Sequence, residues 1–217
     1  MTEEQFWTEF NGIKEELMAH SGANAKQFWS REDLTHDEVF EAIIVRDWLE
    51  IAYVIFLGTE LLNYWREFDR SIVTALCKHM WDEAKHYEML SNVIEKHGYS
   101  VPKTTPETSK EWEELHMKAL TMDCACAVAV WNVSETSTTT TMDVLIENCR
   151  RIGLDDLARC YEKIKKDEAF HCNLGVTILK KYLTTDERRM NAIWGARQLR
   201  DRMFKLYNVI YPVNAVN

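Results

Sequence analysis

Two short segments share one pattern: residues 82–86 read Asp-Glu-Ala-Lys-His, and residues 167–171 read Asp-Glu-Ala-Phe-His. In a helix, side chains three residues apart lie on the same face, so each Glu and its His can converge on one point. Chance gives roughly 0.7 Glu-x-x-His matches in a chain of this composition, but requiring an Asp in front lowers that number to roughly 0.04. Two copies therefore predict two helices that each supply a carboxylate and an imidazole to one metal site.

Two further carboxylates follow from the geometry of helical hairpins, in which residues at one height are equally distant from the turn. Glu50 precedes Glu83 by 33 residues, and the midpoint of this pair falls in an expected turn. Glu135 precedes Glu168 by the same 33 residues, and an offset of 85 relates the two halves, as an internal repeat of hairpins would produce. The expected metal ligands are Glu50, Glu83, His86, Glu135, Glu168 and His171.

Other residues compete for a place in this site. Glu60 is the alternative to Glu50, but its midpoint with Glu83 falls past the turn, so Glu50 is preferred. His79 lies one turn before Glu83 on the same face, where it could be a seventh ligand or, more often, a residue that supports the ligands. Residues 113–116 form a third Glu-x-x-His pattern, but without a preceding Asp or a matching partner we expect it at the surface.

The scarcity of turn formers, with only 7 Gly and 3 Pro, indicates long helices. Capping-box spacings mark four helix starts, at Thr2, Thr35, Thr108 and Thr184. Gly98 and Gly153 each follow two basic residues and mark helix ends. The expected helices span residues 3–19, 36–66, 70–97, 109–151, 155–182 and 186–209. Ser134 to Thr141 has weak helix propensity, so a break there is the alternative to a helix held by tertiary contacts.

Charge and hydropathy argue against several partners. The net charge of −9 would repel a phosphate backbone, so nucleic acid is not an expected partner. The longest apolar runs, 51–58 and 124–131, are 8 residues each, which is far short of a membrane span. The first 20 residues do not resemble a signal peptide, and the 6 Cys include no Cys-x-x-Cys pair. We therefore expect reduced thiols and a cytoplasmic location.

On these ligands the chain resembles the ferritin-like di-iron carboxylate superfamily, over roughly residues 36–183. The resemblance implies an all-α, ferritin-like four-helix bundle with one long crossover and additional N- and C-terminal helices, in a single domain over residues 1–217. It implies two iron ions (Fe2+/Fe3+) as the cofactor, with manganese as the alternative, because this ligand set does not select between them. Asp82 and Asp167 match the residues that accept the free imidazole N–H of the opposite His.

The resemblance also assigns roles among the glutamates. Glu83 and Glu168 match the carboxylates that bridge the two metals. Glu50 and Glu135 match the terminal carboxylates, which each bind one metal.

Thr138 and Thr139 follow Glu135 by three and four residues and so share its helix face. In hydroxylases and desaturases of the superfamily, a Thr at this place lies beside the site of O2 activation, although such hydroxyls can also simply bond to the preceding turn. The resemblance favours a di-iron oxygenase or oxidase acting on a small organic substrate, with Thr139 and Thr138 as catalytic residues. The alternatives are a ferroxidase or rubrerythrin-like iron-handling protein and, third, a structural helical partner.

The partners expected for the preferred function are a small-molecule substrate, O2, a separate reductase and a second copy of the chain in a homodimer. Neither nucleic acid nor a membrane is among them. The identity of the substrate and the kind of oxidation do not follow from the residues.

Overall fold

The computed structural model of the chain describes residues 1–212, and all regular secondary structure in that range is helical. The predicted fold class, an all-α bundle with additional N- and C-terminal helices, is confirmed. The helices are α1 (Glu3–Trp29), α2 (His36–Tyr64), α3 (Arg70–Lys96), α4 (Lys110–Ala119), α5 (Cys124–Arg151), α6 (Asp155–Tyr182) and α7 (Asp186–Ile210), with one 3-10 turn, η1 (Glu107–Ser109).

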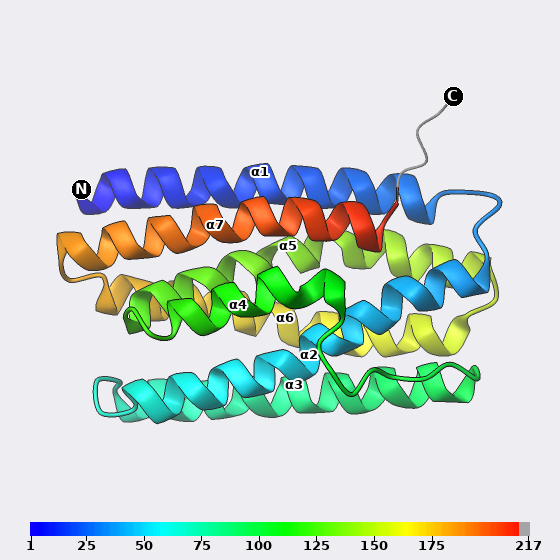
Figure 1. The fold of residues 1–217 in the computed structure, drawn as a ribbon, viewed down its shortest axis with the longest axis horizontal. Helices are drawn as coiled ribbons and strands as arrows, with labels where there is room; N and C mark the ends of the chain where they lie inside the picture. The colour runs from blue at the N-terminus through cyan, green and yellow to red at the C-terminus, as the bar shows by residue number, and fades with distance from the viewer. Residues whose placement is uncertain (213–217) are drawn as a thin grey trace.

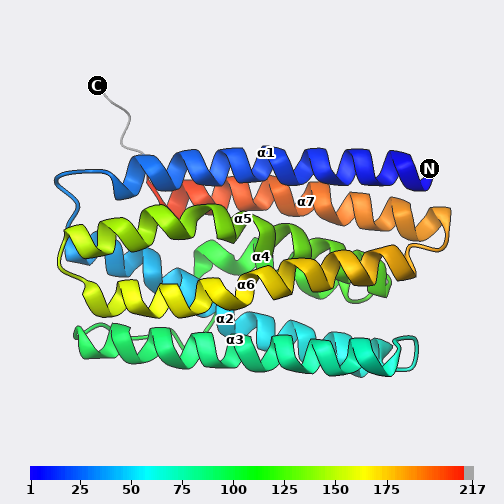
Figure 2. The same cartoon turned by 180° about the vertical axis from the view of Figure 1, so that it is seen from behind.

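Two helical hairpins form the centre of the bundle, α2 with α3 and α5 with α6, and α3 packs against α6 (Figure 1). The connection between the hairpins runs from residue 97 to residue 123 and carries η1 and α4. Helices α1 and α7 lie side by side and cover α5, as Figure 2 also shows from behind. The long helices run along one common axis, so residues from several of them can meet at one height.

Side chains at the helix ends explain where most of the helices begin and stop. Thr35 caps α2 in a complete capping box, because its hydroxyl accepts the Glu38 N–H and the Glu38 carboxylate accepts the Thr35 N–H. Helix α1 begins with the same box at Thr2. Gly98 and Gly153 follow α3 and α5 with φ angles of +86° and +82°, a backbone region that favours glycine.

Four predicted helix starts or ends are wrong, among them the capping box at Thr108, which lies inside η1 and does not cap α4. The expected helix over 109–151 is two helices, because the Asp123 side chain accepts the Cys126 N–H at 2.9 Å and starts a new helix after the turn at 120–123. Helix α1 continues ten residues past the expected end at residue 19, since Phe28 and Trp29 are buried in the core. Helix α7 is capped by Thr185 and not by Thr184.

The threonine-rich run is helical throughout, as preferred over the alternative of a break. Several of its hydroxyls donate to the carbonyl of the preceding turn, for example Thr140 to Ser137 at 2.7 Å. Tertiary contacts hold it as well, because the Ser137 hydroxyl bonds to the Tyr207 hydroxyl at 3.0 Å and Ser21 bonds to Thr140 at 2.9 Å. Packing against α1 and α7 therefore outweighs the weak propensity of this run.

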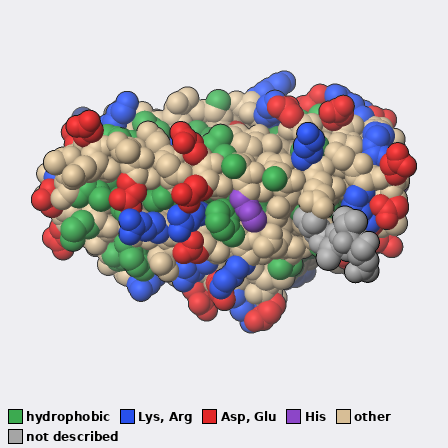
Figure 3. All heavy atoms as spheres, turned by 90° about the horizontal axis from the view of Figure 1, so that it is seen from above, with side chains coloured by type: hydrophobic (Ala, Val, Ile, Leu, Met, Phe, Trp, Pro, Cys, Tyr) green, Lys and Arg blue, Asp and Glu red, His purple; other side chains and the backbone are tan. Residues whose placement is uncertain are grey.

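The outer surface above α1 carries acidic and basic side chains interspersed with one another (Figure 3). Within residues 1–212, no helix has the length and apolar content needed to cross a membrane.

Candidate metal centre

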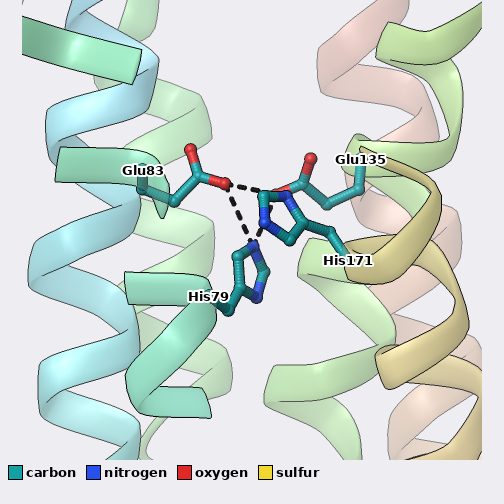
Figure 4. A group of neighbouring side chains, drawn as sticks. All are labelled: His79, Glu83, Glu135 and His171. Atoms are coloured by element: carbon teal, nitrogen blue, oxygen red, sulfur yellow. Dashed lines mark hydrogen bonds and ion pairs between the residues drawn. The ribbon is translucent and has the colours of Figure 1, made fainter. Parts of the chain in front are cut away.

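Seven carboxylate and imidazole side chains from four helices lie together in the interior of the bundle (Figure 4 shows four of them). All are at most 7% exposed: Glu50 on α2, His79, Glu83 and His86 on α3, Glu135 on α5, and Glu168 and His171 on α6. The structure thus brings all six predicted ligands to one place, and it adds His79 to the group. Their role as ligands stays a prediction.

Glu83 lies at the centre of this cluster. Its Oε1 atom is 3.1 Å from His79 Nε2 and 3.1 Å from His171 Nδ1. Its Oε2 atom faces the other way, 3.7 Å from His86 Nδ1, and that nitrogen is 3.2 Å from Glu50 Oε2. The donor atoms therefore form two groups that share Glu83, with all atoms of a group within 4.8 Å of one another. Glu83 thus contributes one carboxylate oxygen to each group, and each group could hold a cation.

We call Glu50, Glu83 and His86 the first group of donor atoms. The second group consists of His79, Glu83, Glu135 and His171. Glu168 lies outside both groups, with its Oε2 atom 4.0 Å from His171 Nδ1. That oxygen is buried and has no hydrogen-bond partner in the described part of the chain, so it could bind a cation held by the second group.

Asp82 and Asp167 lie behind the two histidines of the repeated motif. His171 Nε2 is 3.2 Å from Asp82 Oδ2, and His86 Nε2 is 3.5 Å from Asp167 Oδ2. Each Asp thus faces the His of the opposite helix. An N–H donated to the aspartate leaves Nδ1 of each ring unprotonated and turned toward the glutamates, which is the tautomer a metal requires.

His79 breaks the internal symmetry of the site. The residue 85 positions later, at the equivalent place on α6, is Ile164. The His79 ring stacks on the His171 ring with centroids 3.9 Å apart, and its Nε2 atom is 3.3 Å from Glu135 Oε1. The structure therefore places this nitrogen among the candidate ligand atoms and not behind them.

The charge state of the cluster is compatible with a cation site. Burial, together with the charge of Glu83, raises the pKa of the Glu50 carboxyl to about 7 and holds that of Glu135 well above its usual range. Burial and the charge of Glu135 raise the pKa of Glu168 in the same way. Burial opposes a charge on His86, but hydrogen bonds to two glutamates raise its pKa to about 12. In the absence of a metal, protons therefore balance part of the negative charge of the four carboxylates. Divalent cations could take the place of these protons.

The arrangement of individual atoms also fits metal ions better than hydrogen bonds. Glu83 Oε1 and His171 Nδ1 are buried and 3.1 Å apart, yet within residues 1–212 neither has a hydrogen-bond partner of acceptable geometry. A shared cation would satisfy both atoms at once. Carboxylate oxygens with imidazole nitrogens suit Fe(II) and also Mn(II).

A narrow cavity of about 20 Å³ adjoins the cluster between α2, α5 and α7. Besides the glutamates, its lining comprises Arg46, Leu49, Tyr53, Ser134, Thr138, Met203, Tyr207 and Ile210. Thr138 is thus at the cavity, whereas the Thr139 hydroxyl donates to the Thr136 carbonyl at 2.8 Å and does not line it. The Tyr53 hydroxyl is buried without a hydrogen-bond partner.

Sequence reasoning missed the contributions of Arg46, Met203 and Tyr207 to this cavity. For Arg46 a signal existed, because it lies one turn before Glu50 on the same helix face. For the two residues of α7 no local pattern was available, since their place depends on how that helix packs.

The expectation of a surface position for the third Glu-x-x-His pattern is wrong for its histidine. His116 is 3% exposed, stacks on Phe56 with ring centroids 4.6 Å apart, and donates from Nδ1 to the Trp112 carbonyl at 2.9 Å. Burial lowers the pKa of this imidazole to about 3, so it is a neutral core residue. The helix face that carries it is covered by α2, which a search for motifs does not reveal.

Glu60, the competitor of Glu50, is buried away from both groups of donor atoms. Its Oε2 atom accepts the Trp131 Nε1–H at 2.9 Å, and burial raises the pKa of its carboxyl to about 8. It is therefore held as a neutral acid near pH 7.

The sequence matches no family model and no curated protein. The fold matches a crystal structure of a CADD-like protein of unknown function from Nostoc punctiforme with a TM-score of 0.71 and 14% sequence identity, covering 94% of this chain and 97% of that chain. A second crystal structure with the same description matches with a TM-score of 0.68 and 12% identity, covering 94% and 95%. At such identities the similarity shows that the fold is shared.

Proposed function

We propose that this chain is a ferritin-like di-iron carboxylate protein and an O2-dependent oxidoreductase that oxidises a small organic substrate. The observation that carries the proposal is a buried carboxylate and imidazole cluster that borders a cavity lined by residues other than the candidate ligands. A centre that only moves iron needs no such lining, whereas an oxidase or oxygenase must admit O2 beside the metals, and this cavity of about 20 Å³ would have to widen to admit a substrate as well.

The two groups of donor atoms assign ligands to each ion. Glu50, Glu83 and His86 would hold one, and Glu83, His79, Glu135, Glu168 and His171 would hold the other. Iron is proposed over manganese because reducing O2 requires a metal that gives up electrons, and two ferrous ions bound here would supply them. Further electrons would come from a separate reductase or from the substrate itself.

The residues of the chain around the cavity have roles that do not depend on the metals. Tyr53 and Thr138 occupy equivalent positions of the internal repeat, 85 residues apart, and both line the cavity. The free Tyr53 hydroxyl can donate a hydrogen bond to a molecule in the cavity, and the Thr138 hydroxyl, 3.3 Å from the Ser134 carbonyl, can relay a proton. Met203 and Ile210 from α7, each at most 3% exposed, keep bulk water out.

Metal analysis and O2 consumption test the proposal together. Purified protein loaded with Fe(II) without oxygen should hold about two ions per chain, and the variants Glu83→Ala and His171→Ala should each hold fewer. Full metal content in both variants would show that the ligands are wrongly assigned. Stepwise addition of O2 then separates the functions. Oxidation of many Fe(II) ions per chain into a mineral would identify an iron-handling protein, while oxidation limited to the bound pair supports the oxidoreductase.

A further inference from the structure

We propose that the substrate of this site is a small organic acid and that Arg46 binds its carboxylate. This inference rests on the proposed function, because it names the substrate class of the same cavity. It starts from a buried guanidinium that forms no ion pair with a carboxylate among residues 1–212.

Arg46 is 4% exposed and lines the cavity beside Glu50. Its Nη1 atom donates to the Tyr211 hydroxyl at 2.9 Å and to the Thr141 hydroxyl at 3.1 Å, and both of these partners are neutral. Its Nε atom is buried and has no hydrogen-bond partner among residues 1–212. Among residues 1–212, no carboxylate forms an ion pair with this guanidinium. A buried cation in such a place is costly unless an anion joins it.

The charge balance of the site shows why the nearby acids do not serve as that anion. With metals bound, the four glutamates would carry four negative charges, and two divalent cations would neutralise them, including the charge of Glu50, which acts on Arg46 from one turn away. The neighbouring Asp47 is turned toward α3, where its carboxylate accepts the Ser91 hydroxyl at 3.0 Å. With the metals bound, Arg46 is therefore the cation left without a counter-charge at the cavity.

The guanidinium has the geometry to hold a carboxylate. The planar edge of an arginine matches the two oxygens of a carboxylate, and the Nε atom on that edge is free. The Tyr211 hydroxyl already bonds to Nη1, and the Tyr207 hydroxyl also lines the cavity, so further donors stand close by.

The position of Arg46 sets the size of the acid. Arg46 precedes Glu50 by four residues, which is about 6 Å along a helix, and Thr141 follows Glu135 by six, which is about 9 Å. An acid bound to the guanidinium thus places its reacting group beside the metals only if that group lies several ångströms from the carboxylate. A cavity of about 20 Å³ holds little more than one water molecule, so the flexible Met203 side chain must move when the acid enters.

The internal repeat supports a dedicated role for Arg46. The residue 85 positions later is Trp131, whose indole N–H is bonded to Glu60 within the protein at 2.9 Å. The two equivalent positions therefore differ in kind. Trp131 on α5 has its hydrogen-bond partner within the protein. Arg46 on α2 carries a positive charge, and its hydrogen-bond partners are neutral hydroxyls.

Binding of matched acid and amide pairs tests the proposal. Iron-loaded, oxygen-free protein is titrated with acetate, butyrate and benzoate, and with acetamide, butyramide and benzamide, by calorimetry. We expect at least one acid to bind about ten- to hundredfold more tightly than its amide. The Arg46→Met variant should lose this preference while keeping its metal content, and Arg46→Lys should restore part of it.

The outcomes distinguish this inference from the proposed function. No preference of any acid over its amide in the wild-type protein overturns the inference, and this measurement needs no variant to fold. An acid preference that persists in Arg46→Met also overturns it, even if two metals are bound and O2 is consumed. An Arg46-dependent acid preference in a protein that binds no metal would support the acid site and refute the di-iron function.

Discussion

Glu60 and Glu50 are both buried glutamates on α2, and replacing each by glutamine should have opposite consequences. Glu60 is held as a neutral acid, because burial raises the pKa of its carboxyl from 4.5 to about 8. The folded protein therefore keeps this proton at pH values where the unfolded chain has released it. The stability linked to the proton is fully present below about pH 4.5 and is lost as the pH rises toward 8.

The magnitude follows from that pKa difference. Between pH 5 and pH 8, the titration of Glu60 should lower the free energy of unfolding by about 3 kcal/mol. Glu60→Gln keeps an acceptor for the Trp131 indole and never ionises, so it should escape this loss. For a chain of this size the difference corresponds to roughly 6–12 °C in melting temperature. Asp47, whose pKa burial raises to about 7, titrates in both proteins and cancels in the comparison.

Thermal unfolding of metal-free wild type and Glu60→Gln at pH 5 and pH 8 measures this effect. An equal loss of stability in both proteins would refute the description of Glu60 as a buried neutral acid. Metal analysis of the same variant, beside Glu50→Gln, tests the site. Glu60→Gln should retain both ions and Glu50→Gln should lose one, and the reverse pattern would show that the wrong glutamate of α2 has been assigned.

Three further predictions concern the cluster and the cavity. His79→Gln should lower the metal content from about two ions per chain toward one. His116→Gln, a control in the core, should keep both ions. An unchanged metal content in His79→Gln would show that His79 is not a ligand. Thr138→Val should lower the amount of product formed per O2 consumed with metal content unchanged, whereas Thr139→Val should behave as wild type because Thr139 does not line the cavity. Equal coupling in both variants would remove the threonine from the mechanism. Metal loading at pH 7 should release protons into weakly buffered solution, because the cation replaces protons on carboxyls with raised pKa values. For the same reason the apparent affinity of the protein for the metal should fall as the pH is lowered. A metal affinity that does not depend on pH would contradict the proposed charge balance.

The sequence by itself determined the features that depend on local pattern. The offset of 85 residues between the two halves predicted six acidic and imidazole side chains at one height. In the structure five of them lie in the two groups of donor atoms, and Glu168 lies beside them, with its Oε2 atom 4.0 Å from His171 Nδ1. The ends of α2 and α3 were predicted to within two residues, since a capping box at Thr35 and a glycine at position 98 act on their immediate neighbours. Helix periodicity and end signals are properties of a few adjacent residues, so a linear reading captures them.

Only the tertiary structure decided the details that give the site its chemistry. The His79 ring lies among the candidate ligands, and not behind them, because α3 closely approaches α5 and α6. The distance between these helices cannot be derived from residue spacing in the sequence. The place of Met203 and Tyr207 at the cavity depends on how α7 packs over the bundle. Arg46 became a candidate for binding only when its guanidinium was found buried with neutral partners, because charge balance is a sum over neighbours that are distant in the chain.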